Sequence, residues 1–481
     1  VFDLVCQGQP APVPFLAAGG ANEGLDGPID VVVSDDMRDV YVTTYTPGAV
    51  THFRRQPNGQ LVDPVSYATN AIKGARRLTL SPDGRQLYVA GSLGNGLAIY
   101  TRDTELGTLT FKNEHIDNPI ADGLAGAYGV AVAPDGRHLY VAGSNESSIS
   151  IFSRDADGYV GPEDHLADAS KLAGIKGLAV TADGLFVYAV GYANNLDGFI
   201  GVYHRDLTTG LLTHVQTRKE GEVIAIFPST LFLDGLAGAN DLVISPDGHF
   251  VYVAAYYDSS VMVFSRQPAT GQLTLLRVYR DGANGLDGLG GALDVTLSPD
   301  GQHLFVAGAA DDAVAIFDRD AASGLLSFVE AVKRDANSGQ PKLDNANSVR
   351  VSPDGSTLYV TSGVDDALVW FAVANPKATL TALLPASAKV GSGALTVKVL
   401  GKNFVAGAQV LWNDAPLTTT FASVGELHAV VPAQQLAVQG SATLKVVNPA
   451  PGGGDSHNEQ TFVISAPEAN PAPSIAFLNP P

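Results

Sequence analysis

The sequence contains little cysteine, methionine, tryptophan or charge. Its 481 residues include one Cys, two Met and two Trp, and 16% of them are charged. Cys6 cannot form a disulfide within the chain, and one thiolate cannot build a Cys-based zinc site or an iron–sulfur cluster. Because 45% of the residues are hydrophobic, the low charge does not indicate disorder. We therefore expect folded domains without a disulfide framework.

Basic residues are the scarcer of the two charge types. Lys and Arg number 29 against 49 Asp and Glu, which gives a formal net charge of −20. Duplex nucleic acid and anionic membranes are bound through clustered Lys and Arg, so neither is an expected partner. No run approaches the ~18 apolar residues of a membrane-spanning helix, so we expect no membrane insertion. The chain begins at Val1 without a signal-like segment, which is typical of a processed or trimmed product.

A turn motif repeats through the first 375 residues. Its copies are Ser81–Gly84, Ala133–Gly136, Thr181–Gly184, Ser245–Gly248, Ser298–Gly301 and Ser352–Gly355, with a degenerate first copy at Ser34–Met37. From Asp36 to Asp354 there are 318 residues over six intervals, a mean spacing of 53. This period suits a four-stranded propeller blade, so seven copies predict seven blades.

Each repeat contains the strands that such a blade requires. An apolar strand such as Leu293–Ser298 precedes the turn, and a second strand such as Leu304–Gly308 follows it. A third strand ends in an aromatic residue with Arg two positions later, as in Phe317 and Arg319. No helical periodicity appears, so the expected fold class is all-β, with a seven-bladed β-propeller over residues 1–375. The seventh repeat stops after its third strand, and we expect the segment up to Leu16 to close that blade.

The repeated strings resemble the lactonase-type seven-bladed propellers, also called YVTN-repeat propellers. They are the Ser-Pro-Asp-Gly-x-x-Leu-Tyr-Val-Ala-Gly and Ala-Val-x-Ile-Phe-x-Arg-Asp patterns, and the resemblance covers Gly19 to Ala374. It implies the fold strongly and an activity weakly, since this superfamily mixes sugar lactonases, muconate cycloisomerases and non-enzymatic surface proteins. In enzymatic relatives the chemistry depends on His, Glu and Arg at the central channel. No such set matches here residue by residue.

The sequence changes character after residue 375. Short strands separated by Gly, Pro and Asn fill residues 376–466 and predict an immunoglobulin-like β-sandwich. Gly401–Phe404, Val430–Pro432 and Val446–Pro449 resemble the IPT/TIG family of extracellular Ig-like domains. Residues 467–481 are predicted to be a Pro-rich linker and the first strand of a truncated further Ig-like repeat, because Ser474–Pro481 echoes Thr379–Ala386.

Two columns of charged residues recur from blade to blade. An arginine column is best explained by structural pairing with a neighbouring Asp; it comprises Arg55, Arg102, Arg154, Arg205, Arg266 and Arg319. An acidic column precedes the third strands of blades three to seven: Glu146, Asp197, Asp258, Asp311 and Asp365. Oxygen-rich loops suit Ca²⁺, so these five are the candidate metal ligands. The alternative is that they cap backbone N–H groups in turns.

Residues that break the repeat pattern are the better candidates for function. Arg76, Arg77 and Lys176 occupy slots near the inner strands that are small, apolar or acidic in most blades. They could line the channel and bind an anionic substrate, and they are the candidate catalytic residues. The ten histidines form no recognisable site, and His138, His249 and His303 are expected to be exposed beside the turns.

Two functions of different classes follow from these patterns. We expect a secreted or surface-displayed bacterial protein, located outside the cell or in the periplasm, whose propeller is a binding and assembly module on an Ig-like stalk. Its expected partners are a protein or glycan at the cell surface, with self-assembly as a further option, and Ca²⁺ is the candidate cofactor. The alternative is a lactone hydrolase or related isomerase that acts at the channel through Arg76, Arg77 or Lys176. Without a matching catalytic set, this interpretation leans away from an enzyme.

Overall fold

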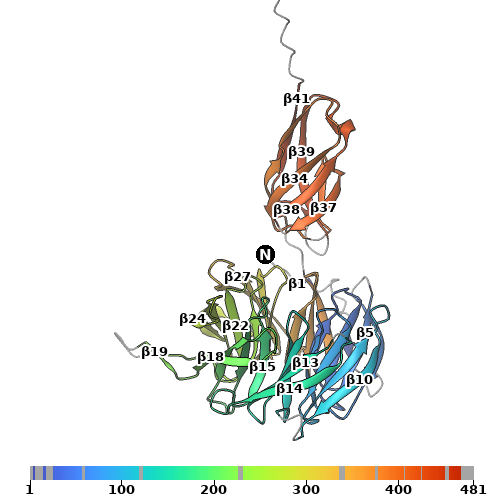
Figure 1. The fold of residues 1–481 in the computed structure, drawn as a ribbon. Coiled ribbons are helices and arrows are strands. Elements are labelled where there is room, and N and C mark those ends of the chain that lie inside the picture. The colour runs from blue at the N-terminus through green and yellow to red at the C-terminus, as the bar shows by residue number, and fades with distance from the viewer. Residues whose placement is uncertain are drawn as a thin grey trace, which may run out of the picture. The chain divides into compact units, whose positions relative to one another are not determined.

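β-Strands make up most of the computed structural model (Figure 1). The structure describes residues 4–5, 15–17, 25–56, 60–118, 123–155, 157–225, 231–334, 342–373, 377–405, 407–423, 425–449 and 454–466. The chain divides into two compact units. One is Cys6–Ala372, and the other contains Val373–Pro481 together with Val1–Val5.

Seven antiparallel sheets form the first unit, and in six of them the four strands follow one another in the chain. The first has β3 (Pro28–Val33), β4 (Asp39–Thr44), β5 (Ala49–Arg55) and β6 (Leu61–Tyr67). The second has β7 (Ala75–Leu80), β8 (Gln86–Gly91), β9 (Gly96–Arg102) and β10 (Leu109–Ile116). The third has β11 (Ala127–Val132), β12 (His138–Gly143), β13 (Ser148–Arg154) and β14 (Val160–Ala167). The fourth has β15 (Ile175–Val180), β16 (Phe186–Gly191), β17 (Phe199–Arg205) and β18 (Leu212–Lys219).

The remaining sheets complete the set. The fifth has β21 (Ala239–Ile244), β22 (Phe250–Ala255), β23 (Ser260–Arg266) and β24 (Leu273–Arg280), and the short helix η1 (Ala283–Gly285) follows. The sixth has β25 (Ala292–Leu297), β26 (His303–Gly308), β27 (Ala313–Arg319) and β28 (Leu326–Lys333). The seventh has β29 (Ala346–Val351), β30 (Thr357–Ser362) and β31 (Ala367–Val373), with β1 (Leu4–Val5) and β2 (Phe15–Ala17) in the same sheet. A separate pair, β19 (Val223–Ala225) and β20 (Leu231–Phe232), extends from the fourth sheet.

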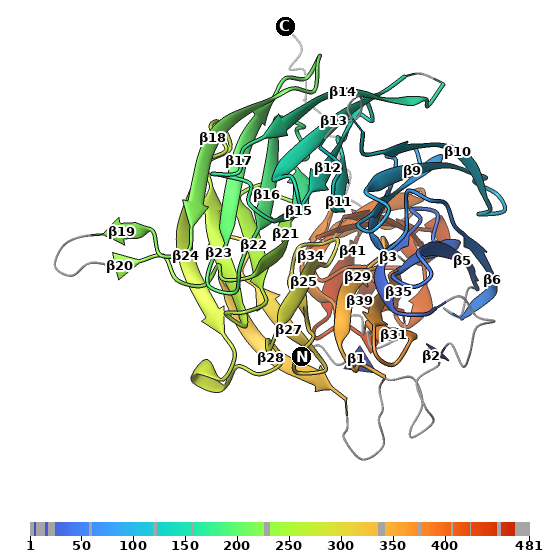
Figure 2. The same cartoon turned by 90° about the horizontal axis from the view of Figure 1, so that it is seen from below.

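The seven sheets close into a ring. Each inner strand packs beside the next, and β29 packs beside β3. Figure 2 shows inner strands such as β11, β15, β21 and β25 near a common centre, with β10, β14, β18 and β24 outside. Phe15–Ala17 pairs with Ala367–Val369 of β31, so a segment from the start of the chain supplies an outer strand to the last sheet. The architecture is the seven-bladed β-propeller that the repeats predict.

The arginine column ties neighbouring blades together. Arg205 is fully buried; its Nη2 lies 2.8 Å from the Asp135 carboxylate and its Nε donates to the Tyr140 hydroxyl at 2.8 Å, both on the preceding blade. The same pairing joins Arg102 to Asp36, Arg154 to Asp83, Arg266 to Asp183 and Arg319 to Asp247. Arg55 instead donates to Tyr359 and Thr357 of the seventh blade. The predicted pairing with a neighbouring Asp is therefore confirmed for five of the six arginines.

Two histidines beside the turns are buried, which corrects the expectation that they are exposed. His138 is 4% exposed and His303 is 8% exposed. Nδ1 of His138 accepts a hydrogen bond from Nη2 of Arg205 at 2.7 Å. The sequence could not show this burial, because the arginine comes from the next blade.

The second unit contains two β-sheets that share one hydrophobic core. One sheet has the order β32 (Thr379–Leu384), β34 (Leu395–Lys402), β38 (Glu426–Val431) and β37 (Thr418–Ser423). The other has the order β33 (Ser387–Lys389), β41 (Gln460–Ser465), β39 (Gly440–Asn448), β35 (Gln409–Trp412) and β36 (Ala415–Pro416), with β40 (Gly454–Asp455) beside β39. The short helix η2 (Ala433–Leu436) follows β38. Val399, Trp412 and Phe462 pack in the common core. The further repeat predicted within residues 467–481 lies outside the described residues.

Candidate functional site

The seven inner strands have equivalent positions that form rings around the channel. At the second position of each strand lie Ile29, Arg76, Tyr128, Lys176, Asn240, Leu293 and Asn347. At the third position lie Asp30, Arg77, Gly129, Gly177, Asp241, Asp294 and Ser348. Charges at these positions are not shared by all blades, so they are not needed to build a blade.

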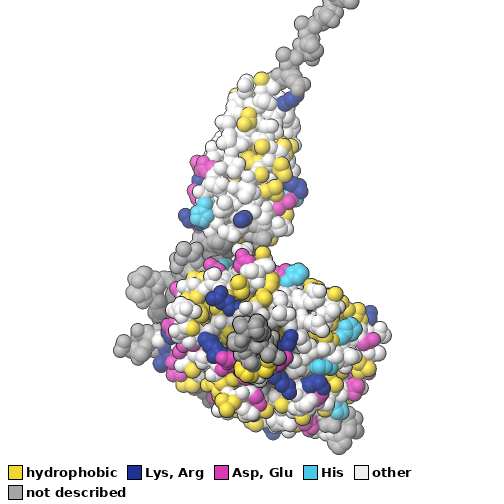
Figure 3. All heavy atoms as spheres, turned by 90° about the vertical axis from the view of Figure 1, so that its left-hand side faces the viewer, with side chains coloured by type: hydrophobic (Ala, Val, Ile, Leu, Met, Phe, Trp, Pro, Cys, Tyr) yellow, Lys and Arg dark blue, Asp and Glu magenta, His cyan; other side chains and the backbone are white. Residues whose placement is uncertain are grey.

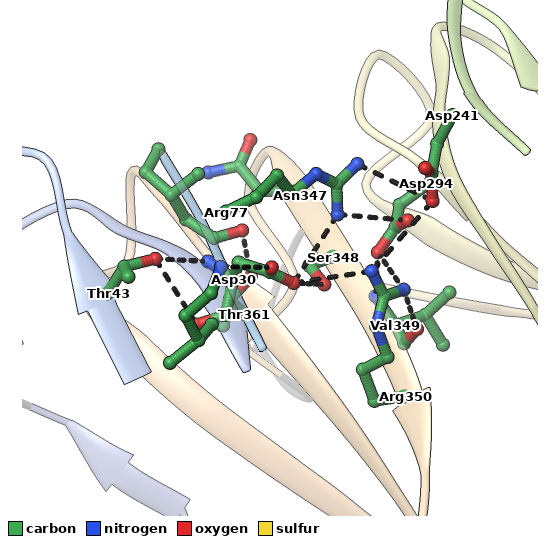
Figure 4. Close-up of polar contacts among 12 residues, drawn as sticks. Asp30, Thr43, Arg77, Asp241, Asp294, Asn347, Ser348, Val349, Arg350 and Thr361 are labelled. Atoms are coloured by element: carbon green, nitrogen blue, oxygen red, sulfur yellow. Dashed lines mark hydrogen bonds and ion pairs between the residues drawn. The ribbon is translucent and has the colours of Figure 1, made fainter. Parts of the chain in front are cut away.

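The third-position ring holds a buried ion-pair network (Figure 4). Arg77, which is 8% exposed, lies 3.1 Å from Asp294, 3.3 Å from Asp30 and 3.5 Å from Asp241. Arg350, from the fifth position of β29, lies 2.7 Å from Asp294 and 3.4 Å from Asp30. Two guanidinium groups thus join carboxyl groups from the first, fifth and sixth blades. Arg77 is fully engaged in this network, so of the three catalytic candidates it is the one placed to stabilise the ring.

The network is balanced in charge only when one carboxyl group holds a proton. Burial raises the pKa of Asp241 well above its ordinary value, and Asp294 adds to the rise, although Arg77 opposes it. Burial also opposes the charge of Asp294, but Arg350 and Arg77 hold the pKa of Asp294 below its ordinary value. Asp294 additionally accepts the backbone N–H of Val349 at 2.9 Å. Asp241 is therefore the member of the pair that takes up a proton more readily, and Asp294 is the one that stays ionised more readily.

A cavity of about 190 Å³ adjoins this network. Asp30, Arg77, Asp241 and Arg350 contribute to its wall, together with the apolar side chains of Val31, Val32, Leu78, Val130 and Leu178. Gly129 also lines it; a Cβ atom there would lie 2.2 Å from the Lys176 carbonyl oxygen, so β11 and β15 approach too closely for a larger residue. Neither Arg76 nor Lys176 lines this cavity.

Arg76 and Lys176 belong instead to a row of alternating cations and aromatic rings, which we call the cation–tyrosine arc. The Arg76 guanidinium lies 4.6 Å from the Tyr45 ring centre and 4.9 Å from that of Tyr128. The Lys176 ammonium lies 4.7 Å from the Tyr128 ring centre and 5.4 Å from that of Tyr192. The arc continues through Tyr257 and Tyr256. Tyr45 and Tyr192 come from turns that follow second strands, so the arc lies where the inner strands begin.

The two cations of the arc have no carboxylate partner among the described residues. The Arg76 Nε donates to the Ser92 hydroxyl at 3.2 Å, and the Lys176 Nζ donates to the Ser144 hydroxyl at 2.9 Å. Both side chains are half-buried. Burial and, to a smaller extent, the Arg76 guanidinium lower the pKa of Lys176 from 10.5 to about 8. In a chain with a net charge of −20, these two half-buried cations are unusual, because no carboxylate of the described residues neutralises them.

The five predicted metal ligands do not meet in one place, because each stands on a different blade. Each described carboxylate accepts a backbone N–H group: Glu146 from Ala125, Asp197 from Ala193, Asp258 from Ala237, Asp311 from Gly290 and Asp365 from Asp344. This is the turn-capping role that the sequence left as the alternative.

Two of these residues also join small acidic clusters. Asp258 lies with Glu220 and Asp234, and Asp311 lies with Asp281 and Asp287. A basic side chain already contacts each cluster: Arg280 is 2.5 Å from Asp234, and Lys333 is 2.5 Å from Asp287 and 3.6 Å from Asp311. On the propeller face that Figure 3 displays, Lys and Arg side chains lie among Asp and Glu side chains. Calcium binding at these loops stays a prediction.

Comparisons with known proteins bear on this site. The model of the family "Lactonase, 7-bladed beta-propeller" matches residues 31–228 and 219–342, more than half of the chain. The chain belongs to this lactonase family. No helix within the described ranges is long and apolar enough to cross a membrane.

Solved structures share the fold at low sequence identity. The periplasmic gluconolactonase PpgL of Pseudomonas aeruginosa is 18% identical, with 89% of this chain and 99% of that chain covered, at a TM-score of 0.54. A 6-phosphogluconolactonase candidate from Bacteroides uniformis is 19% identical, with coverage of 67% and 88% and a TM-score of 0.51. The hydrazine synthase of Kuenenia stuttgartiensis is 17% identical, with coverage of 74% and 99% and a TM-score of 0.53. Such identities show the fold, which carries unrelated activities.

Family membership overturns one expectation from the sequence. The propeller was expected to be a binding and assembly module on a stalk, with a leaning away from an enzyme, and this expectation is wrong; the family match favours the alternative, a lactone hydrolase. The expectation failed because it sought His, Glu and Arg together. At the start of the inner strands the structure instead brings together Arg76, Lys176 and tyrosines, most of them from neighbouring turns.

Sequence reasoning found the cations but missed their surroundings. The acids Asp30, Asp241 and Asp294 could have been found by aligning the third positions of the inner strands. Tyr45 and Tyr257 lie in turns of different blades, where no sequence signal distinguishes them from ordinary loop residues.

Proposed function

We propose that this chain is a lactone hydrolase whose reaction takes place beside Arg76 and Lys176. The observation that carries the proposal is the pair of half-buried cations without a carboxylate partner in the described structure. Hydrolysis of a lactone passes through a tetrahedral oxyanion and ends in a carboxylate, and both are anions that such a pair would stabilise. Membership of the lactonase family supports the same reaction class.

The two cations have different chemical capacities. The Lys176 pKa of about 8 leaves part of its amine neutral near neutral pH, so Nζ can accept a proton from an attacking water. The water oxygen bonds to the lactone carbonyl carbon, and the Arg76 guanidinium faces the oxyanion that forms. When the ring C–O bond breaks, the Lys176 ammonium returns the proton to the leaving alkoxide. The product is a hydroxy acid, which ionises to its carboxylate.

Arg77 has no place in this chemistry. Its three carboxyl neighbours compensate its charge, and its pKa is raised above the ordinary value because, despite burial, Asp241 and Asp294 stabilise the cation. A substrate anion would have to displace them. The catalytic set of the proposal is therefore Lys176 as proton acceptor and Arg76 as oxyanion partner.

The experiment is a proton-release assay of the full chain on a panel of five- and six-membered lactones, with the uncatalysed rate subtracted. Lys176→Arg keeps the charge but cannot accept the proton, so kcat should fall by at least about 10²-fold. Arg76→Met should lower kcat/KM by about 10²–10³-fold. Lys398→Arg, at an exposed ion pair of the second unit, is the matched control and should be unchanged. No turnover of any lactone, or a Lys176→Arg variant as fast as the wild type, would overturn the proposal.

We also propose that the second unit is an immunoglobulin-like domain of the IPT/TIG type. Two sheets with one core, and the parallel pairing of β33 with β41, support it. Limited proteolysis should release a stable fragment that begins near Val373, and rapid degradation of that region would count against a separate domain.

A location outside the cytoplasm is the last part of the proposal. Its support is the resemblance of the second unit to extracellular domains and the periplasmic location named for PpgL. Cell fractionation of the native host should recover the protein outside the cytoplasm, and a purely cytoplasmic protein would contradict the proposal.

A further inference from the structure

The cation–tyrosine arc is longer than a single lactone ring requires. Beyond Lys176 and Tyr192 it continues to Tyr257, whose ring centre lies 5.5 Å from that of Tyr192, and then to Tyr256, another 5.1 Å away. Each ring is nearly perpendicular to the next, at 89° and 88°. Tyr257 is 41% exposed and the other two are half-buried. Aromatic surface that can meet a ligand therefore extends from the fourth blade to the fifth.

Glycines hold two of these rings in place. Gly238 has φ +79°, and a Cβ atom there would lie 2.7 Å from Cδ2 of Tyr257. Gly291 has φ +64°, and its Cβ atom would lie 2.9 Å from Cε2 of Tyr256. Both rings thus pack against backbone that only glycine allows, which limits their movement. Rings that are fixed before binding lose little entropy when a ligand stacks on them.

The hydroxyl groups of the arc lack a hydrogen-bond partner among the described residues, unlike those of the tyrosines that build the blades. Tyr140, Tyr188 and Tyr252 each donate a hydrogen bond from the hydroxyl to a backbone carbonyl of a neighbouring blade. In the described part of the chain, no hydrogen bond is made by the hydroxyl groups of the five arc tyrosines, Tyr45, Tyr128, Tyr192, Tyr256 and Tyr257. Free phenol hydroxyls beside exposed ring surface suit a ligand that offers both C–H surface and hydroxyl groups, as a sugar does.

We propose that the substrate is a sugar lactone that carries a second sugar ring, the lactone of a disaccharide aldonic acid. This inference rests on the proposed lactone hydrolysis. The lactone ring lies at Arg76 and Lys176, and the second sugar ring lies against Tyr192 and Tyr257. Arg76 and Lys176 both lie on one side of Tyr192 and Tyr257 in the arc, so the charged end of the product is next to Lys176. Exposed Asn195, in the same turn as Tyr192, adds an amide for sugar hydroxyls.

Binding of the reaction product, an aldonate, tests the disaccharide assignment without any need for turnover. Titration calorimetry on the full chain would compare gluconate with lactobionate, which is gluconate that carries a galactose ring. Lactobionate should bind more tightly than gluconate. Tyr257→Ala should lower the affinity for lactobionate by roughly 2- to 12-fold and leave the affinity for gluconate unchanged, since Tyr257 contacts only the second sugar ring. Tyr159→Ala, a 53% exposed tyrosine outside the arc, is the matched control and should change neither.

Kinetics give the second readout. With lactobionolactone, Tyr257→Ala should raise KM and leave kcat unchanged, because the second ring contributes equally to substrate and transition-state binding. The disaccharide assignment would be overturned if the wild type bound gluconate and lactobionate with equal affinity. It would also be overturned if Tyr257→Ala lowered the affinity for both ligands by the same factor. Tighter binding of an aryl-substituted acid than of lactobionate would overturn it in favour of an aromatic ligand. If no lactone is hydrolysed but lactobionate binding depends on Tyr257, the hydrolase proposal fails and the sugar subsite remains.

Discussion

Arg76 and Arg77 are neighbours on β7, and replacing each with methionine tests whether Arg76 serves the proposed ligand and Arg77 the fold. Arg77 is buried among Asp30, Asp241 and Asp294, with Arg350 as the only other cation of the network. Removing one partner of a buried ion pair costs about 3–5 kcal/mol, because the remaining charge is left uncompensated. Proton uptake by one of the three carboxyl groups limits the loss. We expect Arg77→Met to lower the free energy of unfolding by about 3–5 kcal/mol at neutral pH.

Arg76→Met should behave differently. Arg76 stacks on two tyrosines but has no carboxylate partner within the described ranges, and it lies beside Lys176. Its ring contacts contribute about 0.5–1 kcal/mol, and relief of the repulsion from Lys176 offsets part of that. The net loss of stability should be below about 1 kcal/mol, whereas kcat/KM for the lactone should fall by about 10²–10³-fold.

The chain offers a simple assay for the comparison. It has two tryptophans, Trp370 in the seventh blade and Trp412 in the second unit. In a Trp412→Phe background, the fluorescence of Trp370 reports urea unfolding of the propeller alone. Equal losses of stability for the two methionine variants would refute the assignment of Arg77 to the ring and of Arg76 to the ligand.

Three further predictions concern protons and cations. The pKa of Asp241 is raised in the folded chain, whereas the unfolded chain loses this proton above about pH 4. The free energy of unfolding should therefore fall as the pH rises from about 4 to the raised pKa of Asp241. Asp241→Asn should remove this fall, which urea midpoints measured across the same pH range would show. Because the neutral amine of Lys176 is the base, kcat/KM should rise with pH and level off above about 8, and a rate that falls there would assign the ammonium form instead. Chelation of divalent cations should leave the melting temperature unchanged, because Arg280 and Lys333 already contact the acidic clusters of Asp258 and Asp311. A melting temperature raised by added Ca²⁺ would show that the ion displaces these two basic side chains.

Repetition made the propeller predictable from sequence. A Pro-Asp-Gly turn at a mean spacing of 53 residues, followed by strands such as Leu304–Gly308, specifies one blade, and local turn chemistry needs no knowledge of the rest of the chain. The structural role of the arginine column was also predictable, because a residue that recurs in most blades stabilises a feature that the blades have in common. Symmetry likewise indicated where to look for function, since Arg76, Arg77 and Lys176 break it.

Only the tertiary structure decided which groups those three residues contact. Arg76 and Arg77 are adjacent in sequence, but successive side chains of a strand point in opposite directions, so one meets two tyrosines and the other meets three carboxyl groups. Asp241 and Asp294 come from blades on other parts of the ring, and ring closure alone brings them to Arg77. The sequence by itself determined the repeat, the blade and the residues that depart from it. Whether a cation is neutralised depends on partners that are far away in the sequence, up to 217 residues for Arg77 and Asp294, and that was decided by how the seven sheets close around the channel.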